Sequence, residues 1–253
     1  MFEAWIRGKN NNPEDVLTSH VFGTLKYFEP EDILGPFLRK AFNPYTNKSL
    51  DLPTITKFGK FKNETTPLFW KFIQQPGCGG CEPDVLIDFV HENQTRSLIL
   101  IEVKYESLKS SQADEKSPMA NDQLAKYWEN LALLGQELDA KPILIYLTAH
   151  YSCPDEEIEE SQKELLLKGK QRGDFFWLSW RHLSNLFAEI EAPLLKDLQA
   201  LIEQFYQFQY FECDWTSASL PCTWKFNNLS WSWVHQKSSY PKIKWGFSND
   251  RER

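Results

Sequence analysis

Three side chains suited to phosphate chemistry lie near the ends of two short aliphatic segments. Asp84 directly precedes the segment 85–90, and Glu102 and Lys104 close the segment that begins at Leu98. Two carboxylates offer the hard oxygen ligands that Mg²⁺ and Mn²⁺ prefer, and an ammonium group adds positive charge for a phosphate. A metal ion held in this way generates hydroxide near neutral pH. The residue types therefore predict metal-dependent hydrolysis of phosphodiesters.

The two aliphatic segments indicate a pair of antiparallel strands. Each run is short, rich in branched side chains and bounded by turn residues, which is typical of strands buried on both faces. The polar segment 91–96 between them has the length of a hairpin loop. If Val90 lies opposite Ser97, Asp84 lies opposite Val103, level with the two residues that flank it. We therefore expect Asp84, Glu102 and Lys104 to meet at one end of a buried hairpin.

A simpler interpretation of the same residues is available. A Glu-x-Lys triplet on a strand is commonly a solvated salt bridge, and an Asp after a proline is commonly a turn residue. In this chain, however, Leu98 and Leu100 precede Glu102 on the same face of the strand. Burial of an unpaired charge costs several kcal/mol. A metal site with a positioned lysine accounts for charges at such a place.

Length and composition set the class of protein. The 253 residues suffice for one large domain or a domain with an appendage. The net charge is 28 minus 35, or −7, which argues against nonspecific coating of nucleic acid. No apolar run approaches the ~18 residues of a membrane span, and the first residues lack the pattern of an export signal. We expect a cytoplasmic protein that does not bind membranes, with its five cysteines reduced.

A helix is predicted upstream of the hairpin. Asn12 suits the N-cap and Pro13 the first helical position. Glu14 lies on the same face as the apolar stripe that begins at Leu17, so it points inward near the helix N-terminus. The acid either complements the helix dipole or reaches the metal site.

A second helix is predicted downstream of the hairpin, after a mobile linker over 105–116. It begins at Ser117-Pro118 and stops at Gly135, a glycine typical of the position beyond a helix C-terminus. Gln123 lies at the boundary between core and solvent, either as an exposed glutamine or as a contributor to the site. The remaining predicted elements are a short helix at 31–41, strands at 67–73, 142–148 and 175–180, a solvated loop or helix face at 155–160, and helices at 181–190 and 193–211.

Two further groups of side chains are candidates for contact with nucleic acid. Lys57, Lys60 and Lys62 alternate with phenylalanines, as either a phosphate-binding patch or a solvated loop. The tail 213–253 carries an aromatic hairpin around Asn227-Asn228 and, from residue 216 on, six basic against two acidic residues. Stacking on its rings beside cations suits single-stranded or distorted nucleic acid. The candidates in the tail are Trp231, Trp233, Lys242 and Lys244.

The alternative for the tail is that its aromatic face packs on the main domain. In either case we expect a domain over 1–212 and an aromatic, basic appendage over 213–253.

Cys78 and Cys81 have the spacing of a zinc knuckle, for which Cys213 and Cys222 would supply the other two ligands. Structural zinc is thus an alternative to free thiols.

Pro83-Asp84, followed after 17 residues by Glu102-Val103-Lys104, resembles the signature of the PD-(D/E)XK nuclease superfamily. The resemblance implies the restriction-endonuclease-like α/β fold, an αβββαβ core with a mixed central sheet flanked by helices. The order of the predicted elements matches this core over about residues 13–150.

The resemblance also implies roles for individual residues. Asp84 and Glu102 are then metal ligands together with the backbone carbonyl of Val103. Lys104 orients the attacking water or stabilises charge on the phosphate, and Glu14 completes or tunes the metal site.

Two positions extend the resemblance. Asp15 is a less favoured alternative to its neighbour Glu14. Gln123, followed by Tyr127, is similar to the glutamine that some branches of the superfamily carry on the helix after the Glu-x-Lys strand.

The sequence thus predicts a Mg²⁺- or Mn²⁺-dependent endonuclease that cuts DNA. Its target is selected by the tail, by a homodimer or by a protein partner, and a role in defence against foreign DNA rests on analogy alone. One alternative is a noncatalytic nucleic-acid-binding or assembly subunit that keeps the nuclease fold. Another is RNA as the substrate.

Overall fold

The computed structural model describes residues 3–208 apart from residues 10, 106, 108, 115, 116, 188–190 and 207. The aromatic hairpin of the tail, the boundary at 212/213 and the candidates Trp231, Trp233, Lys242 and Lys244 lie outside the described residues. They stay predictions.

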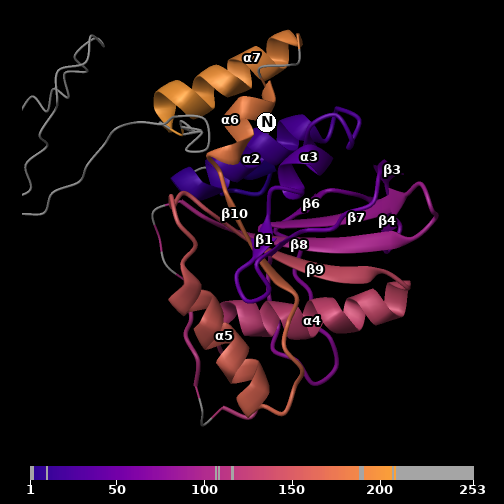
Figure 1. Ribbon diagram of the computed structural model, residues 1–253, viewed down its shortest axis with the longest axis vertical. Helices are drawn as coiled ribbons and strands as arrows, with labels where there is room; N and C mark the ends of the chain where they lie inside the picture. Colours follow the sequence, from indigo (N-terminus) through magenta and orange to yellow (C-terminus); the bar gives the residue numbers. More distant parts are fainter. Residues whose placement is uncertain are drawn as a thin grey trace, which may run out of the picture. The chain divides into compact units, whose positions relative to one another are not determined.

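The described chain is a mixed α/β structure (Figure 1). Its helices are α1 (Glu3–Ile6), α2 (Pro13–Leu25), α3 (Leu34–Leu38), α4 (Gln123–Leu138), α5 (Asp155–Leu167), α6 (His182–Phe187) and α7 (Pro193–Ala200), the last continued by a π-helical turn at Leu201–Phe205. Its strands are β1 (Phe42–Asn43), β2 (Lys48–Ser49), β3 (Ile55–Phe58), β4 (Lys60–Phe61), β5 (Glu64–Thr65), β6 (Leu68–Phe69), β7 (Val85–His91), β8 (Arg96–Lys104), β9 (Lys141–Thr148) and β10 (Phe175–Ser179).

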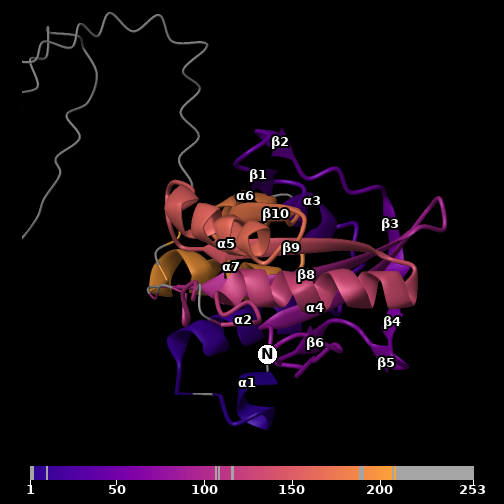
Figure 2. The same cartoon turned by 90° about the horizontal axis from the view of Figure 1, so that it is seen from below.

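Eight strands form one mixed sheet in the order β2-β1-β10-β9-β8-β7-β3, with β6 also paired to β7. The pair β7–β8 is antiparallel, whereas β8–β9 and β9–β10 are parallel. Helices α2, α3, α6 and α7 cover one face of this sheet, and α4 and α5 cover the other (Figures 1 and 2). The predicted mixed sheet flanked by helices is therefore confirmed.

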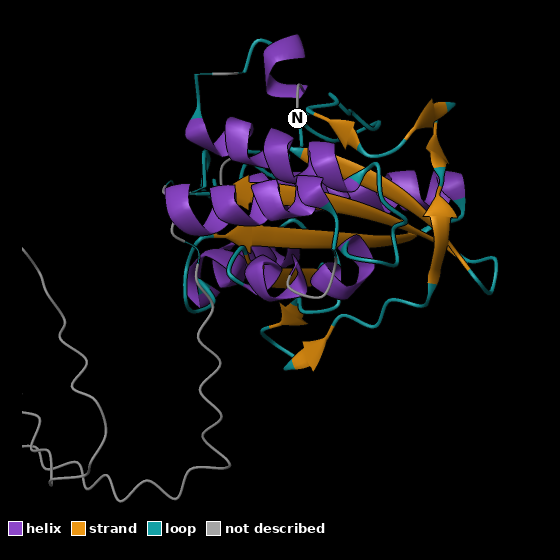
Figure 3. Ribbon diagram, turned by 90° about the horizontal axis from the view of Figure 1, so that it is seen from above, coloured by secondary structure: helices purple, strands orange, loops and turns teal. Residues whose placement is uncertain are grey.

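Alternation along the central strands divides the interior into two cores. Ile99, Ile101 and Val103 of β8 pack with α2, while Leu98 and Leu100 pack with α4. Successive side chains of a strand point to opposite faces, so a strand covered by helices on both sides reads as a continuous aliphatic run. Figure 3 shows the helices stacked over the strands.

The predicted register of the hairpin is wrong by one residue. Val90 lies opposite Arg96 rather than Ser97, and Val85 lies opposite Ile101. The strand continues through His91, whose buried ring lies between the Pro53 carbonyl and the Ser97 hydroxyl. A polar residue at this place predicts a loop, because Pro53 lies 38 residues away and the contact with Ser97 exists only once the two strands have paired.

Across the same hairpin, Arg96 donates two hydrogen bonds to the fully buried Asp88 carboxylate, at 3.2 and 2.7 Å. Gly59 packs against this carboxylate so closely that an added Cβ would lie 2.0 Å from Asp88 Oδ2. A charged pair with good geometry specifies one register, because a slip would leave the Asp88 charge buried without a partner.

Helix α2 agrees closely with the helix predicted upstream of the hairpin. Asn12 caps α2, and its side chain accepts a hydrogen bond from the Glu14 amide at 3.1 Å. Pro13 occupies the first helical position, where its missing N–H would have had no partner. Leu17 is fully buried on the sheet side of the helix. Glu14 therefore starts the inward-facing stripe.

Helix α4, the helix predicted downstream of the hairpin, begins later and ends later than predicted. Asp122 is its N-cap, accepting from the Ala125 amide, and the helix runs through Gly135 to Leu138. A Cβ on Gly135 would lie 2.7 Å from the Ala140 carbonyl oxygen. The glycine is thus required by the close return of the chain, and Asp139, with φ of 50°, ends the helix instead.

Other predicted elements differ in extent. The strand expected at 67–73 is only β6, the helix expected at 31–41 is only α3, and the helix expected at 193–211 is α7 with its π-helical turn. The acidic stretch 155–160 is the first part of α5. Every helix in the described part of the chain is too short or too polar to span a membrane.

Candidate functional site

The structure brings Asp84, Glu102 and Lys104 together at the end of the β7–β8 hairpin. The Lys104 ammonium donates to Glu102 Oε1 at 2.7 Å, and the Val103 amide donates to Asp84 Oδ2 at 2.7 Å. The three residues are only 8%, 2% and 6% exposed, respectively. They form a buried cluster rather than the solvated salt bridge that the simpler interpretation expects.

The Glu102 carboxylate has one satisfied and one unsatisfied oxygen. Its Oε1 also accepts from Gln123 Nε2 at 2.5 Å. Its Oε2 is buried and has no hydrogen-bond donor among the described residues. A buried charged oxygen without a partner is costly, so this atom requires a proton or a cation beside it.

The electrostatics of Asp84 also favour a proton or a cation at this site. Burial, and after it repulsion by Glu102, hold the pKa of Asp84 well above its ordinary range. Burial likewise raises the pKa of Glu102, although Lys104 opposes the shift. Two neighbouring carboxyl groups removed from water favour a shared proton or a bound cation over two free negative charges. The pair is therefore suited to a positively charged ligand.

Lys104 lies between two acids. Burial by itself would lower the pKa of its ammonium group, but the Glu102 and Glu14 carboxylates more than offset this and raise it. Glu14 Oε1 lies 3.6 Å from the Lys104 Nζ. The lysine is thus a permanent cation at neutral pH, held against the carboxylates rather than free to act as a base.

Glu14 connects α2 to the end of β8. Its Oε2 accepts from the Tyr105 amide and from the Ser107 hydroxyl, both at 2.8 Å. The acid therefore lies at the site, beyond its favourable position in the first turn of α2. Its role as a metal ligand stays a prediction, as does that of the Val103 carbonyl. Among the described residues, no three His, Cys, Asp or Glu side chains are grouped in a way that could hold a metal ion.

Gln123 is buried rather than exposed, at the first turn of α4. While its Nε2 donates to Glu102, its Oε1 accepts from the Ser110 amide at 2.9 Å. Tyr127, one turn later, lies 3.3 Å from Gln123 Nε2 and donates to the Glu82 carbonyl at 3.1 Å. Gln123 thus orients the Glu102 carboxylate, and Tyr127 contacts Gln123 and the Glu82 backbone.

Trp70 is a site residue that the sequence did not reveal. Its indole Nε1 donates to Asp84 Oδ1, and its amide donates to the Asp84 carbonyl, both at 3.2 Å. Lys9 Nζ lies 5.7 Å from the Trp70 ring centre and 2.5 Å from Glu82 Oε1. The prediction placed Trp70 within a strand, but its φ of 47° turns the chain so that the ring reaches Asp84. No local sequence signal distinguishes this conformation.

Trp70→Phe removes the indole N–H donor and the five-membered ring while keeping an aromatic side chain at this buried position. On the prediction that Asp84 is a metal ligand, we expect Mn²⁺ binding to weaken by ~10–100-fold, because a group that orients a ligand carboxylate typically contributes about that factor. Titration calorimetry with Mn²⁺ measures the change. The matched control is Trp5→Phe at a ring that is 68% exposed. Equal Mn²⁺ affinity for both variants would mean that Trp70 does not position Asp84.

The lysine patch lies away from this cluster. Lys57 is exposed on the edge strand β3 opposite Val90, six residues along β7 from Asp84, or about 20 Å at ~3.3 Å per residue. Lys60 and Lys62 are also exposed. The structure thus does not bring these side chains to the site, and their contact with nucleic acid stays a prediction.

Cys78 and Cys81 are buried free thiols. Burial raises the pKa of the Cys81 thiol to about 12, and it raises the pKa of Cys78 as well. The other two ligands of the possible zinc site, Cys213 and Cys222, lie outside the described residues. Structural zinc is therefore untested.

No protein family, no curated protein and no solved structure matches this chain.

Proposed function

We propose that this protein is a metal-dependent nuclease that hydrolyses phosphodiester bonds of DNA and has the restriction-endonuclease-like fold. The order α2, β6, β7, β8, α4, β9 supports the αβββαβ core. The observation that carries the proposal is the buried Glu102 Oε2 beside Asp84 and Lys104, an oxygen for which no described residue supplies a hydrogen-bond donor. A buried carboxylate oxygen without a donor destabilises the folded state, whereas the same oxygen can bind a cation.

The proposal assigns a divalent ion to the two carboxylates that the hairpin brings together. Asp84 and Glu102 would hold Mg²⁺ or Mn²⁺ through their carboxylates, joined by the Val103 carbonyl. When bound, the ion supplies an activated hydroxide and neutralises developing charge on the phosphate. The fit rests on the raised pKa values of the two acids and on the unsatisfied Glu102 oxygen.

The protein's own side chains have distinct tasks in this proposal. The Lys104 ammonium presents a fixed positive charge to the scissile phosphate, and the Glu14 and Glu102 carboxylates hold it in place. Gln123 and Trp70 hold Glu102 and Asp84 by single hydrogen bonds. Rigid placement of charges is the main contribution that a protein makes to phosphoryl chemistry.

The test is cleavage of plasmid and single-stranded DNA with Mg²⁺ or Mn²⁺, with EDTA as the metal-free condition. We expect wild-type protein to cut and both Asp84→Asn and Lys104→Ala to lose the activity. Thermal unfolding of each variant separates loss of chemistry from loss of folding. Cleavage that persists in both folded variants would refute the proposed site, and the same assay on RNA decides the polynucleotide.

The second candidate is a noncatalytic nucleic-acid-binding or assembly subunit. It is favoured by the way in which both Asp84 oxygens and Lys104 are already engaged by protein groups, with no third acid grouped to complete a metal site in the described part of the chain. DNA binding without any cleavage in Mg²⁺ and Mn²⁺ would favour this candidate.

A further inference from the structure

The carboxyl ends of three parallel strands lie side by side at the candidate site. Lys104 at the end of β8 pairs with Thr148 at the end of β9, which pairs in turn with Ser179 at the end of β10. Neighbouring strands are ~4.8 Å apart, so the chain leaves β10 within about 10 Å of the Lys104 backbone. Open α/β sheets bind their ligands outside the carboxyl ends of the strands. Side chains that follow β9 and β10 are therefore well placed to contact a substrate.

Tyr151, three residues after β9, presents a large ring at this edge of the sheet and is 76% exposed. The loop that carries it is fixed to β10, because the Ser179 hydroxyl donates to the His150 carbonyl at 2.8 Å. Three residues span at most ~11 Å, so the Cα atom of Tyr151 lies within about 16 Å of the Cα atom of Lys104. The ring is therefore close enough to contact a polymeric substrate that is bound at the site.

One face of the Tyr151 ring is covered by a guanidinium group. Arg181 lies with this group 3.5 Å from the Tyr151 ring centre and 5.6 Å from the ring centre of Phe208, which is 2% exposed. Phe208 also contacts Tyr105, the residue after Lys104, at 5.7 Å. A planar guanidinium stacks on an aromatic face and fixes its orientation. Because the ring is 76% exposed although one face is covered, its other face is open to solvent.

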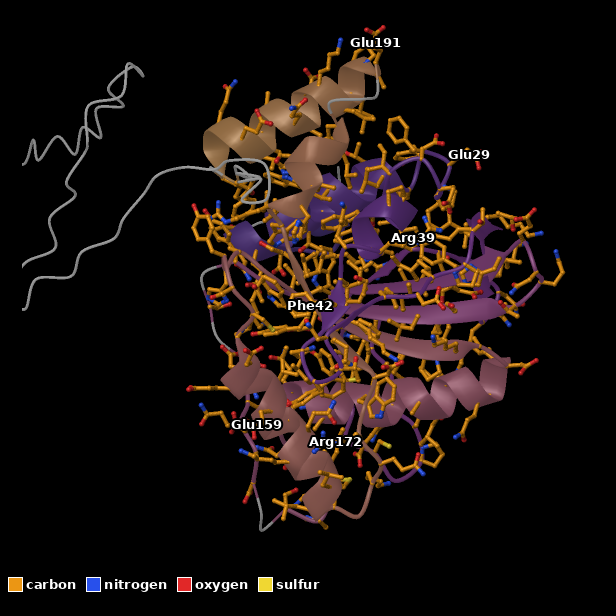
Figure 4. All side chains as sticks on the ribbon, viewed as in Figure 1. Glu29, Arg39, Phe42, Glu159, Arg172 and Glu191 are labelled. Atoms are coloured by element: carbon orange, nitrogen blue, oxygen red, sulfur yellow. The ribbon has the colours of Figure 1, made fainter. Side chains whose placement is uncertain are left out.

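The charges near Tyr151 favour a base rather than a phosphate as the group that contacts this ring. Helix α5 begins four residues later, with Asp155, Glu156 and Glu157 in its first turn. Glu159 projects outward from the same helix (Figure 4). Carboxylates at the start of α5 repel phosphate groups, whereas a neutral base of any kind can stack on an aromatic ring. The open face of Tyr151 is therefore suited to a nucleobase.

We propose that Tyr151 stacks on an unpaired base of the DNA strand held at the Lys104 cluster, so that the protein selects single-stranded over duplex DNA. Bases in a duplex cover one another's faces, and exposing a face requires that the base leaves the stack. At ~3.4 Å per nucleotide, a span of up to about 16 Å places this base within about five nucleotides of the scissile phosphate. The inference rests on the proposed nuclease function and specifies its substrate class.

The experiment is fluorescence anisotropy of the full-length protein with a labelled DNA single strand and with the blunt duplex of that strand and its complement. Both are measured in EDTA, so that neither is cut. We expect wild type to bind the single strand more tightly than the duplex. Tyr151→Ala should weaken single-strand binding by ~5–150-fold, the usual effect of one base stacked on an aromatic ring, and leave duplex binding unchanged. Tyr151→Phe keeps the ring and should bind as wild type does.

Tyr27→Ala is the matched control. Tyr27 is 75% exposed and also has a cation over its ring, with Lys26 Nζ at 5.1 Å from the ring centre. It follows the end of α2 that is distant from Glu14, so this variant should bind both DNAs as wild type does. A wild-type protein without preference for the single strand would overturn the inference. The same holds if folded Tyr151→Ala binds the single strand as wild type does, or loses affinity for both DNAs equally.

Failure of the nuclease proposal gives a different result. Single-strand binding that depends on Tyr151, without any cleavage in Mg²⁺ or Mn²⁺, would support the stacking contact and refute the nuclease activity. Cleavage by wild type together with unchanged single-strand binding by Tyr151→Ala would support the nuclease and overturn the stacking contact.

Discussion

Glu102→Gln is expected to lower the rate of Mg²⁺-dependent DNA cleavage by at least ~10²–10³-fold, the usual loss when a group that stabilises transition-state charge is removed. Glutamine keeps the volume and one acceptor oxygen for Lys104 and Gln123, whose hydrogen bonds to Glu102 Oε1 measure 2.7 and 2.5 Å. It removes the negative charge that a divalent ion requires beside Asp84. Initial rates of plasmid nicking measure the effect.

The same variant has a second expected property. Burial raises the pKa of Asp84, and repulsion by Glu102 adds to the shift, so removal of the Glu102 charge relieves unfavourable energy in the folded state. The relief opposes the loss of the buried ion pair between Lys104 and Glu102, so thermal unfolding in EDTA must first show that Glu102→Gln is folded. Mn²⁺ should raise the unfolding temperature of wild type only, because ligand binding to the native state stabilises it.

Glu92→Gln, at an exposed turn of the same hairpin, is the control and should behave as wild type. A folded Glu102→Gln protein that cuts at the wild-type rate would exclude Glu102 from the chemistry. A variant that loses both folding and activity would show instead that the carboxylate serves stability.

Lys109→Met is expected to lower the free energy of unfolding by about 3–5 kcal/mol, the usual loss when one partner of a buried ion pair is removed. The side chain of Lys109 is 3% exposed and pairs with the fully buried carboxylate of Asp122. It also donates to the Glu157 carbonyl at 2.8 Å and to Ser161 Oγ at 3.1 Å. Methionine fills a similar volume but leaves the Asp122 charge without its cation.

Lys109→Met should also disturb the candidate site, because Lys109 lies next to Ser110, whose amide donates to Gln123 Oε1 at 2.9 Å. Urea unfolding measures the change in free energy, and the unfolding temperature should fall by about 6–20 °C at ~2–4 °C per kcal/mol for a chain of this size. Lys163→Met, at a lysine 66% exposed on α5, is the matched control and should stay within ~0.5 kcal/mol. A loss for Lys109→Met as small as that of the control would contradict the ion pair.

The contrast between these two positions shows which features local sequence can reveal. Glu102 interrupts an aliphatic run on the buried face of a strand, and this anomaly is visible in the sequence alone. Lys109 lies in a polar segment that was predicted to be a mobile linker. Its partners Asp122 and Glu160 are 13 and 51 residues away, so only folding shows that the linker is anchored.

The amino-acid sequence was enough to predict the features whose signals are local: the Asn12 cap of α2, the aliphatic strands β7 to β10, and the convergence of Asp84, Glu102 and Lys104 at a strand end. Periodicity and capping depend on neighbours within a few residues, which is why they can be read without coordinates. The hairpin register, the continuation of α4 through Gly135 and the contact of Trp70 with Asp84 became known only from the folded chain. Each of these depends on groups far apart in the chain that meet after the sheet has formed, and packing between such groups overrides local preference.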